Sequence, residues 1–81
     1  EEITIGGYQV DLLITDGIHI LIELTSSTKN KDVENLLKAA SAYREEKGIE
    51  PQLYIVTAYI SPRLYHLVKE KGITILSHDS M

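Results

Sequence analysis

Two carboxylates lie in neighbouring runs of strand-forming residues near the start of this chain. Asp11 opens the run DLLIT, and Glu23 lies in the run IHILIELTSS, with the turn-forming pair Asp16-Gly17 between the two runs. Carboxylate oxygens suit Mg²⁺ and Mn²⁺, which complete their coordination shells with water and phosphate oxygens. If the strands bring these two side chains together, the chemistry they suit is metal-assisted hydrolysis of a phosphodiester.

The distance between the carboxylates depends on the loop that joins the two strands. A two-residue loop at Asp16-Gly17 would pair Thr15 with Ile18 and would mix apolar and charged residues on both faces. A three-residue loop, residues 15–17 with Gly17 in the left-handed conformation, pairs Ile14 with Ile18 instead. It gathers one apolar face: Val10, Leu12, Ile14, Ile18, Ile20, Ile22 and Leu24.

We predict the three-residue loop, because a slip of one residue would turn every side chain of a strand to the opposite face. In this register Asp11 lies across from Leu21 and one diagonal step from Glu23. The two carboxylates then leave the same face, with their Cβ atoms about 7–8 Å apart. That separation would allow them to share one metal ion.

The elements around this pair follow from turn signals and periodicity. The segment ITIGGYQV predicts a hairpin with its turn at Gly6-Gly7, pairing Ile5 with Tyr8 and Ile3 with Val10. Residues 31–47 have apolar side chains at helical spacing, with Asn30 or Asp32 available as N-cap and Gly48 as the C-terminal stop.

The rest of the chain completes a mixed sheet. Residues 51–60, PQLYIVTAYI, form a strand that is apolar on both sides and therefore central. Ser61 and Pro62 begin a second helix that Gly72 ends, residues 73–76 form the last strand, and residues 77–81 are expected to fray. The order βββαβαβ predicts an α/β (α+β) fold, in which an antiparallel three-strand meander is followed by βαβ units.

The segment VDLLITDGIHILIELTSS resembles the core of the PD-(D/E)XK nuclease superfamily, which has the restriction-endonuclease-like fold. Asp11 matches the aspartate of that motif and Glu23 matches its second acidic residue. Leu24 matches the intervening residue, whose backbone carbonyl usually joins the metal shell. The resemblance extends over residues 3–60 in element order, and it implies Mg²⁺ or Mn²⁺ as cofactor and DNA as partner.

The chain departs from that family at two points. Thr25 stands where the family has the lysine that positions and activates the attacking water, so Thr25 would at best orient water in a catalytic set with Asp11 and Glu23. The helix that usually precedes the first strand is missing. Lysine migrates in such families, and the candidates here, which could also contact nucleic acid, are Lys29, Lys31 and Lys38.

Three functional hypotheses remain open at this stage. The favoured one is a nuclease-like domain that binds or acts on nucleic acid with weakened or lost activity. The second is an active Mg²⁺-dependent DNA endonuclease or exonuclease. The third is a homo-oligomerising structural module that uses the surface of Tyr54, Tyr59 and Tyr65. Alternatively, Asp11 and Glu23 belong to a solvated sheet face, the lysines flank a helix, and His19 is a surface residue.

Composition limits the setting of the domain. We expect the 81 residues to form a single nuclease-like domain, 1–81, and, because the sequence starts at Glu1, we expect this domain to be a fragment of a longer chain. There is no cysteine and no apolar run long enough for a membrane, so we expect a cytoplasmic protein. The formal net charge of −4 argues against strong nonspecific attraction to nucleic acid phosphates.

Overall fold

A five-stranded mixed sheet and two helices make up the computed structural model, which describes residues 1–77. The elements are β1 (Glu2–Ile5), β2 (Tyr8–Thr15), β3 (Ile18–Ser27), α1 (Asn30–Lys47), β4 (Gln52–Tyr59), α2 (Pro62–Glu70) and β5 (Thr74–Ser77). The predicted order βββαβαβ is therefore confirmed. Within the described residues, neither helix is long and apolar enough to cross a membrane.

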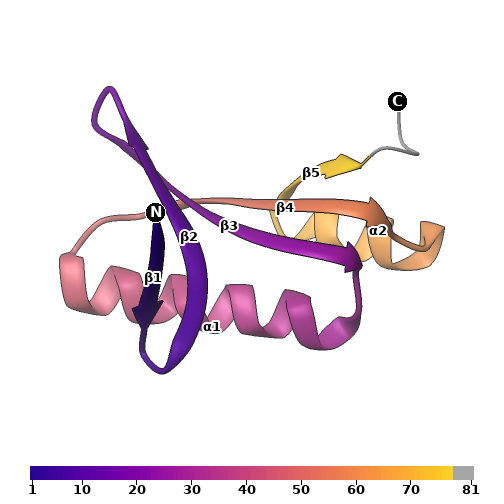
Figure 1. Ribbon diagram of the computed structural model, residues 1–81, viewed down its shortest axis with the longest axis horizontal. Helices are drawn as coiled ribbons and strands as arrows, with labels where there is room; N and C mark the ends of the chain where they lie inside the picture. The colour runs from indigo at the N-terminus through magenta and orange to yellow at the C-terminus, as the bar shows by residue number, and fades with distance from the viewer. Residues whose placement is uncertain (78–81) are drawn as a thin grey trace.

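The strands lie in the sheet in their order along the chain, from β1 at one edge to β5 at the other. The β1–β2 and β2–β3 pairs are antiparallel, whereas β3–β4 and β4–β5 are parallel. Each parallel pair is joined by a helical crossover, and right-handed crossovers in this strand order place both helices on one face of the sheet. Figure 1 shows α1 and α2 together below the sheet, with the opposite face uncovered.

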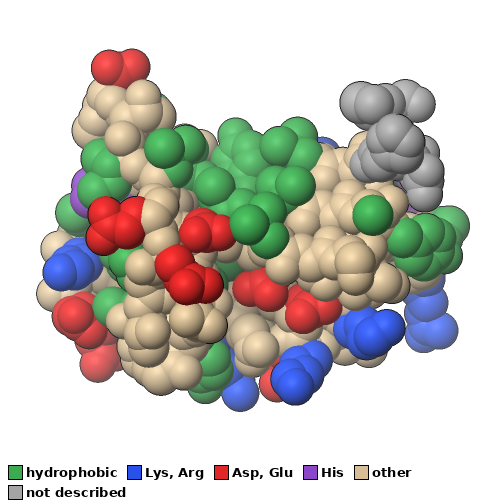
Figure 2. Space-filling view, viewed as in Figure 1, with side chains coloured by type: hydrophobic (Ala, Val, Ile, Leu, Met, Phe, Trp, Pro, Cys, Tyr) green, Lys and Arg blue, Asp and Glu red, His purple; other side chains and the backbone are tan. Residues whose placement is uncertain are grey.

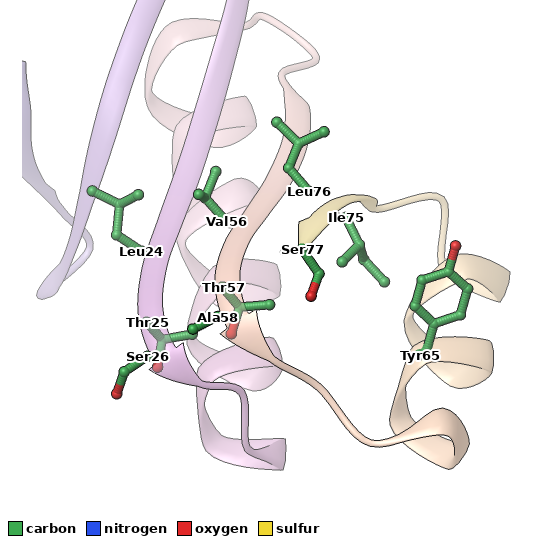
Figure 3. Close-up of a pocket in the computed structure, with 10 residues that line it drawn as sticks. All are labelled: Leu24, Thr25, Ser26, Val56, Thr57, Ala58, Tyr65, Ile75, Leu76 and Ser77. Carbon is green, nitrogen blue, oxygen red and sulfur yellow. The ribbon is translucent and has the colours of Figure 1, made fainter. Parts of the chain in front are cut away.

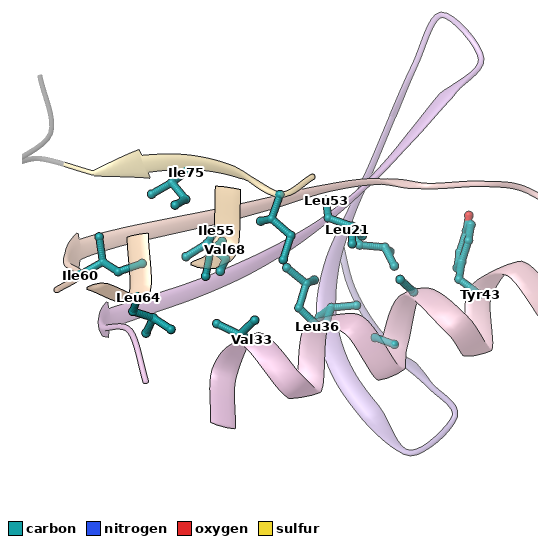
Figure 4. Close-up of a cluster of buried hydrophobic side chains, with 14 of the residues drawn as sticks. Leu21, Val33, Leu36, Tyr43, Leu53, Ile55, Ile60, Leu64, Val68 and Ile75 are labelled. Atoms are coloured by element: carbon teal, nitrogen blue, oxygen red, sulfur yellow. The ribbon is translucent and has the colours of Figure 1, made fainter. Parts of the chain in front are cut away.

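The core lies between the sheet and the two helices. Leu21 and Ile55, from the central strands, are fully buried against Leu36 of α1 and Val68 of α2 (Figure 4). Only the helix-facing side of β4 is fully buried, at Leu53, Ile55 and Thr57, while Tyr54 and Val56 on the other side are half-buried, although the strand is central as predicted. Burial of apolar area is the main stabilising contribution in so small a domain.

The first predicted turn is confirmed. Ile5 pairs with Tyr8 and Ile3 with Val10, and both turn glycines have positive φ angles. Gly6 also lies directly against α1, since a Cβ at this position would be 2.6 Å from the Cβ of Ala42. The turn of the first hairpin therefore packs closely against α1.

The predicted register of the second hairpin is wrong. Thr15 pairs with Ile18 across a two-residue turn, in which Asp16 has a φ of 51° and Gly17 a φ of 78°. Positive φ at both positions is the mark of a type I′ turn, whose twist matches that of the flanking strands. The prediction assumed that β3 has a single apolar face. In the structure β3 carries apolar residues on both faces, and one of these faces is not covered by a helix.

Helix and strand ends differ from the predictions by one residue at several places. Lys29 is the N-cap of α1, rather than Asn30 or Asp32, while the predicted C-terminal stop at Gly48 is confirmed by its left-handed conformation. Ser61 caps α2 with Pro62 in its first turn, as predicted. Ser77, expected to fray, is a buried residue of β5, and residues 78–81 of the same predicted tail lie outside the described part.

Candidate functional site

Glu23 lies on β3 next to the point where β2 and β3 part. Its side chain is half-buried on the face that α1 covers. Burial raises the pKa of the Glu23 carboxyl, and the negative charges of Asp32 and then Asp11 raise this pKa further. All three influences disfavour the ionised form. The site therefore concentrates negative charge in a partly desolvated position.

Asp11 does not lie where the predicted register placed it. It pairs with Ile22, the last ladder pair between β2 and β3, so in a regular sheet its side chain would leave the face opposite that of Glu23. The same-face geometry from which the carboxylate pair was predicted is therefore wrong. Asp11 is nevertheless a direct neighbour of the Glu23 position, and its charge reaches the Glu23 carboxyl.

Asp32 is a third acidic residue of this site, and the sequence analysis treated it only as a helix cap. It lies in the first turn of α1, where its carboxylate accepts a hydrogen bond of 2.8 Å from the backbone N–H of Lys29. The chain reverses direction between β3 and α1, which returns this residue towards Glu23. Strand spacing contains no signal for such a contact.

Thr25 follows Glu23 by two residues and therefore belongs to the same face of β3. Its hydroxyl donates a hydrogen bond of 3.1 Å to the carbonyl oxygen of Ser27. Thr25 pairs with Thr57, which pairs with Ser77, so a row of hydroxyl residues crosses the three parallel strands. This row helps to line a shallow pocket at the carboxyl ends of the strands (Figure 3).

The three candidate lysines do not form one cluster. Lys38 forms an ion pair of 3.5 Å with Glu34 and lies 6.0 Å from the centre of the Tyr8 ring, on the side of the first hairpin. Lys31 is exposed in the first turn of α1. Lys29 lies at the N-terminus of α1, beside a hollow that it shares with Arg63 of α2. Sequence reasoning missed Arg63, because only the parallel pairing of β3 with β4 brings it there.

Acidic and basic side chains are unevenly distributed over the face that Figure 2 shows. Acidic side chains gather over the middle of this face, and several basic side chains lie towards the end where α1 begins, while both signs occur together at the opposite end. His19 is not a surface residue, since it is half-buried and its Nδ1 lies 2.5 Å from the hydroxyl oxygen of Tyr43. That bond ties β3 to α1 and gives His19 a structural partner.

By charge and atom type the two carboxylates would suit a divalent cation, but the β2–β3 register does not place them on one face. Carboxylate oxygens of Asp11 and Glu23, with a backbone carbonyl at Leu24, are hard oxygen ligands. A cation at Glu23 would offset the repulsion that raises the pKa of this residue. Residues 1–77 contain no group of three or more acidic, histidine or cysteine side chains arranged to hold a metal, so water and substrate oxygens would complete the shell.

A model of the PD-(D/E)XK nuclease superfamily matches residues 8–74, which include both carboxylates, the hydroxyl row as far as Thr57, and the first basic residues of both helices. The chain belongs to the PD-(D/E)XK nuclease superfamily. Members of this superfamily generally use divalent metals. The match confirms the resemblance on which the sequence interpretation rested.

The fold agrees with this membership of the PD-(D/E)XK superfamily. The structure is similar to the crystal structure of a repair endonuclease from Pyrococcus abyssi, with a TM-score of 0.74 and 17% sequence identity. The similarity covers 95% of this chain and 37% of the endonuclease chain, so this chain spans little more than a third of that protein. A search of curated proteins gave no match. The restriction-endonuclease-like fold is thereby shown.

Proposed function

We propose that this domain binds nucleic acid and that its capacity for phosphodiester hydrolysis is weakened or lost. The observation that carries the proposal is the environment of Glu23. Every influence on its pKa is a raising one, and no cationic side chain is among them. The family lysine would place an ammonium two residues away, but Thr25 supplies a hydroxyl already engaged with Ser27.

Asp11 and Glu23, with the carbonyl of Leu24, are the groups that would hold Mg²⁺ or Mn²⁺. When bound, such an ion lowers the pKa of water and offsets charge on a phosphate. The carboxylates would fix its position, and the Thr25 hydroxyl oxygen could accept a hydrogen bond from a water molecule while its own O–H donates to the Ser27 carbonyl oxygen. Without a nearby ammonium, the attacking water lacks its usual positioning group.

A cleavage assay separates the favoured function from an active nuclease. The chain is incubated with single- and double-stranded DNA and Mn²⁺, as wild type, Asp11→Ala and Thr25→Lys. We expect DNA binding without appreciable cleavage by the wild type, and slow cleavage by Thr25→Lys because the ammonium is restored beside Glu23. Cleavage by the wild type that disappears in Asp11→Ala would establish the active enzyme instead.

Metal binding can be tested without turnover. A ligand that binds only the folded state raises the melting temperature by mass action. We expect Mn²⁺ to raise the melting temperature of the wild type and to have a smaller effect on Glu23→Gln, which keeps the shape but removes one charge. Equal shifts in the two proteins, or no shift in either, would rule out a metal site that includes Glu23.

Self-association is a second candidate function, and the open face of the sheet favours it. Leu24 and Leu76 leave 60% and 52% of their surface exposed there, and Figure 3 shows both projecting from the same face as Val56. Of the tyrosines first proposed for this role, Tyr59 is exposed, whereas Tyr54 and Tyr65 are half-buried. Many specific complexes have dissociation constants in the micromolar range or below. Sedimentation that shows only monomer at a protein concentration of about 100 µM would therefore rule out this candidate.

A further inference from the structure

The two helices begin side by side, next to the carboxyl ends of β3 and β4. Ser27, the last residue of β3, pairs with Tyr59, the last residue of β4, and the next N–H, that of Thr28, donates a 2.9 Å bond to the Tyr59 carbonyl oxygen. Because these strands are parallel and end together, the helices that follow them start next to each other at the carboxyl ends of the strands. A hollow between the two starts is lined by Thr28, Lys29, Asn30, Ser61, Arg63 and Leu64.

The helix ends supply hydrogen-bond donors to this hollow. The first N–H groups of a helix have no acceptor within it, and the helix dipole places partial positive charge there. The structure already uses some of these donors: Asp32 accepts from Lys29, and the Ser61 hydroxyl accepts from Leu64 at 3.2 Å. The amides of Asn30 and Arg63 precede the hydrogen-bond ladders of α1 and α2, and no acceptor for them is found among residues 1–77.

Thr28, which lines this hollow, provides an independent observation. Only 7% of this residue is exposed, and its hydroxyl oxygen is buried without a hydrogen-bond partner among the described residues. No other buried side-chain polar atom in residues 1–77 lacks one. A buried hydroxyl without a partner is destabilising, so such groups usually have a protein, water or ligand partner.

Two cations flank the same hollow. Lys29 and Arg63 are both exposed, and within residues 1–77 neither takes part in an ion pair, since those found join Lys38 to Glu34 and Arg44 to Glu50. The carboxylate of Asp32 opposes them with one negative charge. The two side chains and two helix ends outweigh it, so the hollow attracts anions.

We propose that Thr28, Lys29 and Arg63, with the starts of α1 and α2, bind a phosphate oxyanion. A tetrahedral anion can accept from the Thr28 hydroxyl, first-turn amides and the Arg63 guanidinium together. Its identity as a strand phosphate of nucleic acid rests on the proposed function. The oxyanion chemistry itself does not, because free phosphate presents the same oxygen atoms.

Inorganic phosphate tests the site directly. Melting temperature is measured over a phosphate titration against chloride at constant ionic strength, for wild type, Thr28→Val, Arg63→Gln and the control Lys69→Gln, which removes the same charge from the other end of α2. We expect the half-maximal phosphate concentration to rise about tenfold in Arg63→Gln, the loss typical of one charge-assisted bond, and to stay unchanged in Lys69→Gln.

Thr28→Val has a signature that a merely structural role would not give. In chloride it should melt at a higher temperature than the wild type, because it removes an unpaired buried hydroxyl, yet its phosphate response should be weaker. Equal phosphate responses in wild type, Thr28→Val and Arg63→Gln, or none in the wild type, would overturn the site.

A binding titration with single-stranded DNA distinguishes the two sources of phosphate. Weaker DNA binding by Thr28→Val and Arg63→Gln, but not by Lys69→Gln, would identify the anion as a strand phosphate. A phosphate response that depends on these residues, with DNA binding absent, would support the oxyanion site and contradict the proposed function.

Discussion

Glu23 is the residue whose environment the structure defines most sharply. Its raised pKa means that ionisation is less favourable in the folded chain than in the unfolded one. Ionised Glu23 therefore lowers the free energy of unfolding at neutral pH. This penalty decreases as the pH falls through the folded pKa, and it is absent below the ordinary carboxyl range, where both states are protonated.

We expect Glu23→Gln to melt at a higher temperature than the wild type at pH 7 in metal-free buffer. The difference should shrink on acidification and vanish below about pH 4, near the pKa of an unfolded glutamate. Glu46→Gln, at an exposed position of α1, provides the matched control. A Glu23→Gln advantage that stays constant between pH 4 and 7 would show that charge is not its cause.

At this scale the sequence identified residues that lie close together along the chain. Asp11, Glu23 and Thr25 could be found because the turn between their strands is short. Asp32 and Arg63 could not be assigned, because their positions depend on a chain reversal and on a strand pairing that spans the whole of α1. The unpartnered hydroxyl of Thr28 is visible only once its surroundings are known.

The elements themselves were more predictable than their registers. Capping residues and glycine stops defined both helices to within a residue or two, since they act locally. The second hairpin was misassigned because an apolar face was assumed to be a buried one. The bare preference of Asp16-Gly17 for a two-residue turn was the better guide.

The first hairpin provides a prediction at the level of elements. Gly6 and Gly7 both have positive φ, so alanine is strained at either position, but only at Gly6 would its Cβ meet Ala42, at 2.6 Å. We expect Gly6→Ala to lower the free energy of unfolding by about 1–3 kcal/mol more than Gly7→Ala, the range of an overpacked contact. Urea denaturation of the two variants measures this difference. Equal losses would mean that the turn does not rest on α1.

For the molecule as a whole, the uneven covering of the sheet is the main feature. Both helices lie on one face, and the other face presents exposed Leu24 and Leu76 beside the candidate site. The exposed side chains of Leu24 and Leu76 on the open face take no part in the chemistry proposed for the carboxylates.

We expect the double substitution Leu24→Ser and Leu76→Ser to reduce self-association at high concentration, because it removes exposed apolar surface. The two changes should cost little folding stability, about 0.5 kcal/mol or less each, as is usual for exposed positions. Leu36→Ala, at a fully buried position, should instead cost about 2–5 kcal/mol. Sedimentation and urea denaturation measure the two effects. Unchanged association in the double variant would exclude this face as the contact.

The position of β3 at the centre of the sheet has a consequence for synthesis of the chain. Its antiparallel partner β2 has already been made when β3 emerges, whereas its parallel partner β4 follows only after all of α1. Until then one side of β3 presents unpaired backbone groups, together with apolar side chains on both faces. Such a strand can recruit another nascent chain. Pairing with β4 satisfies the unpaired backbone groups of β3, and the same pairing brings the starts of α1 and α2 together.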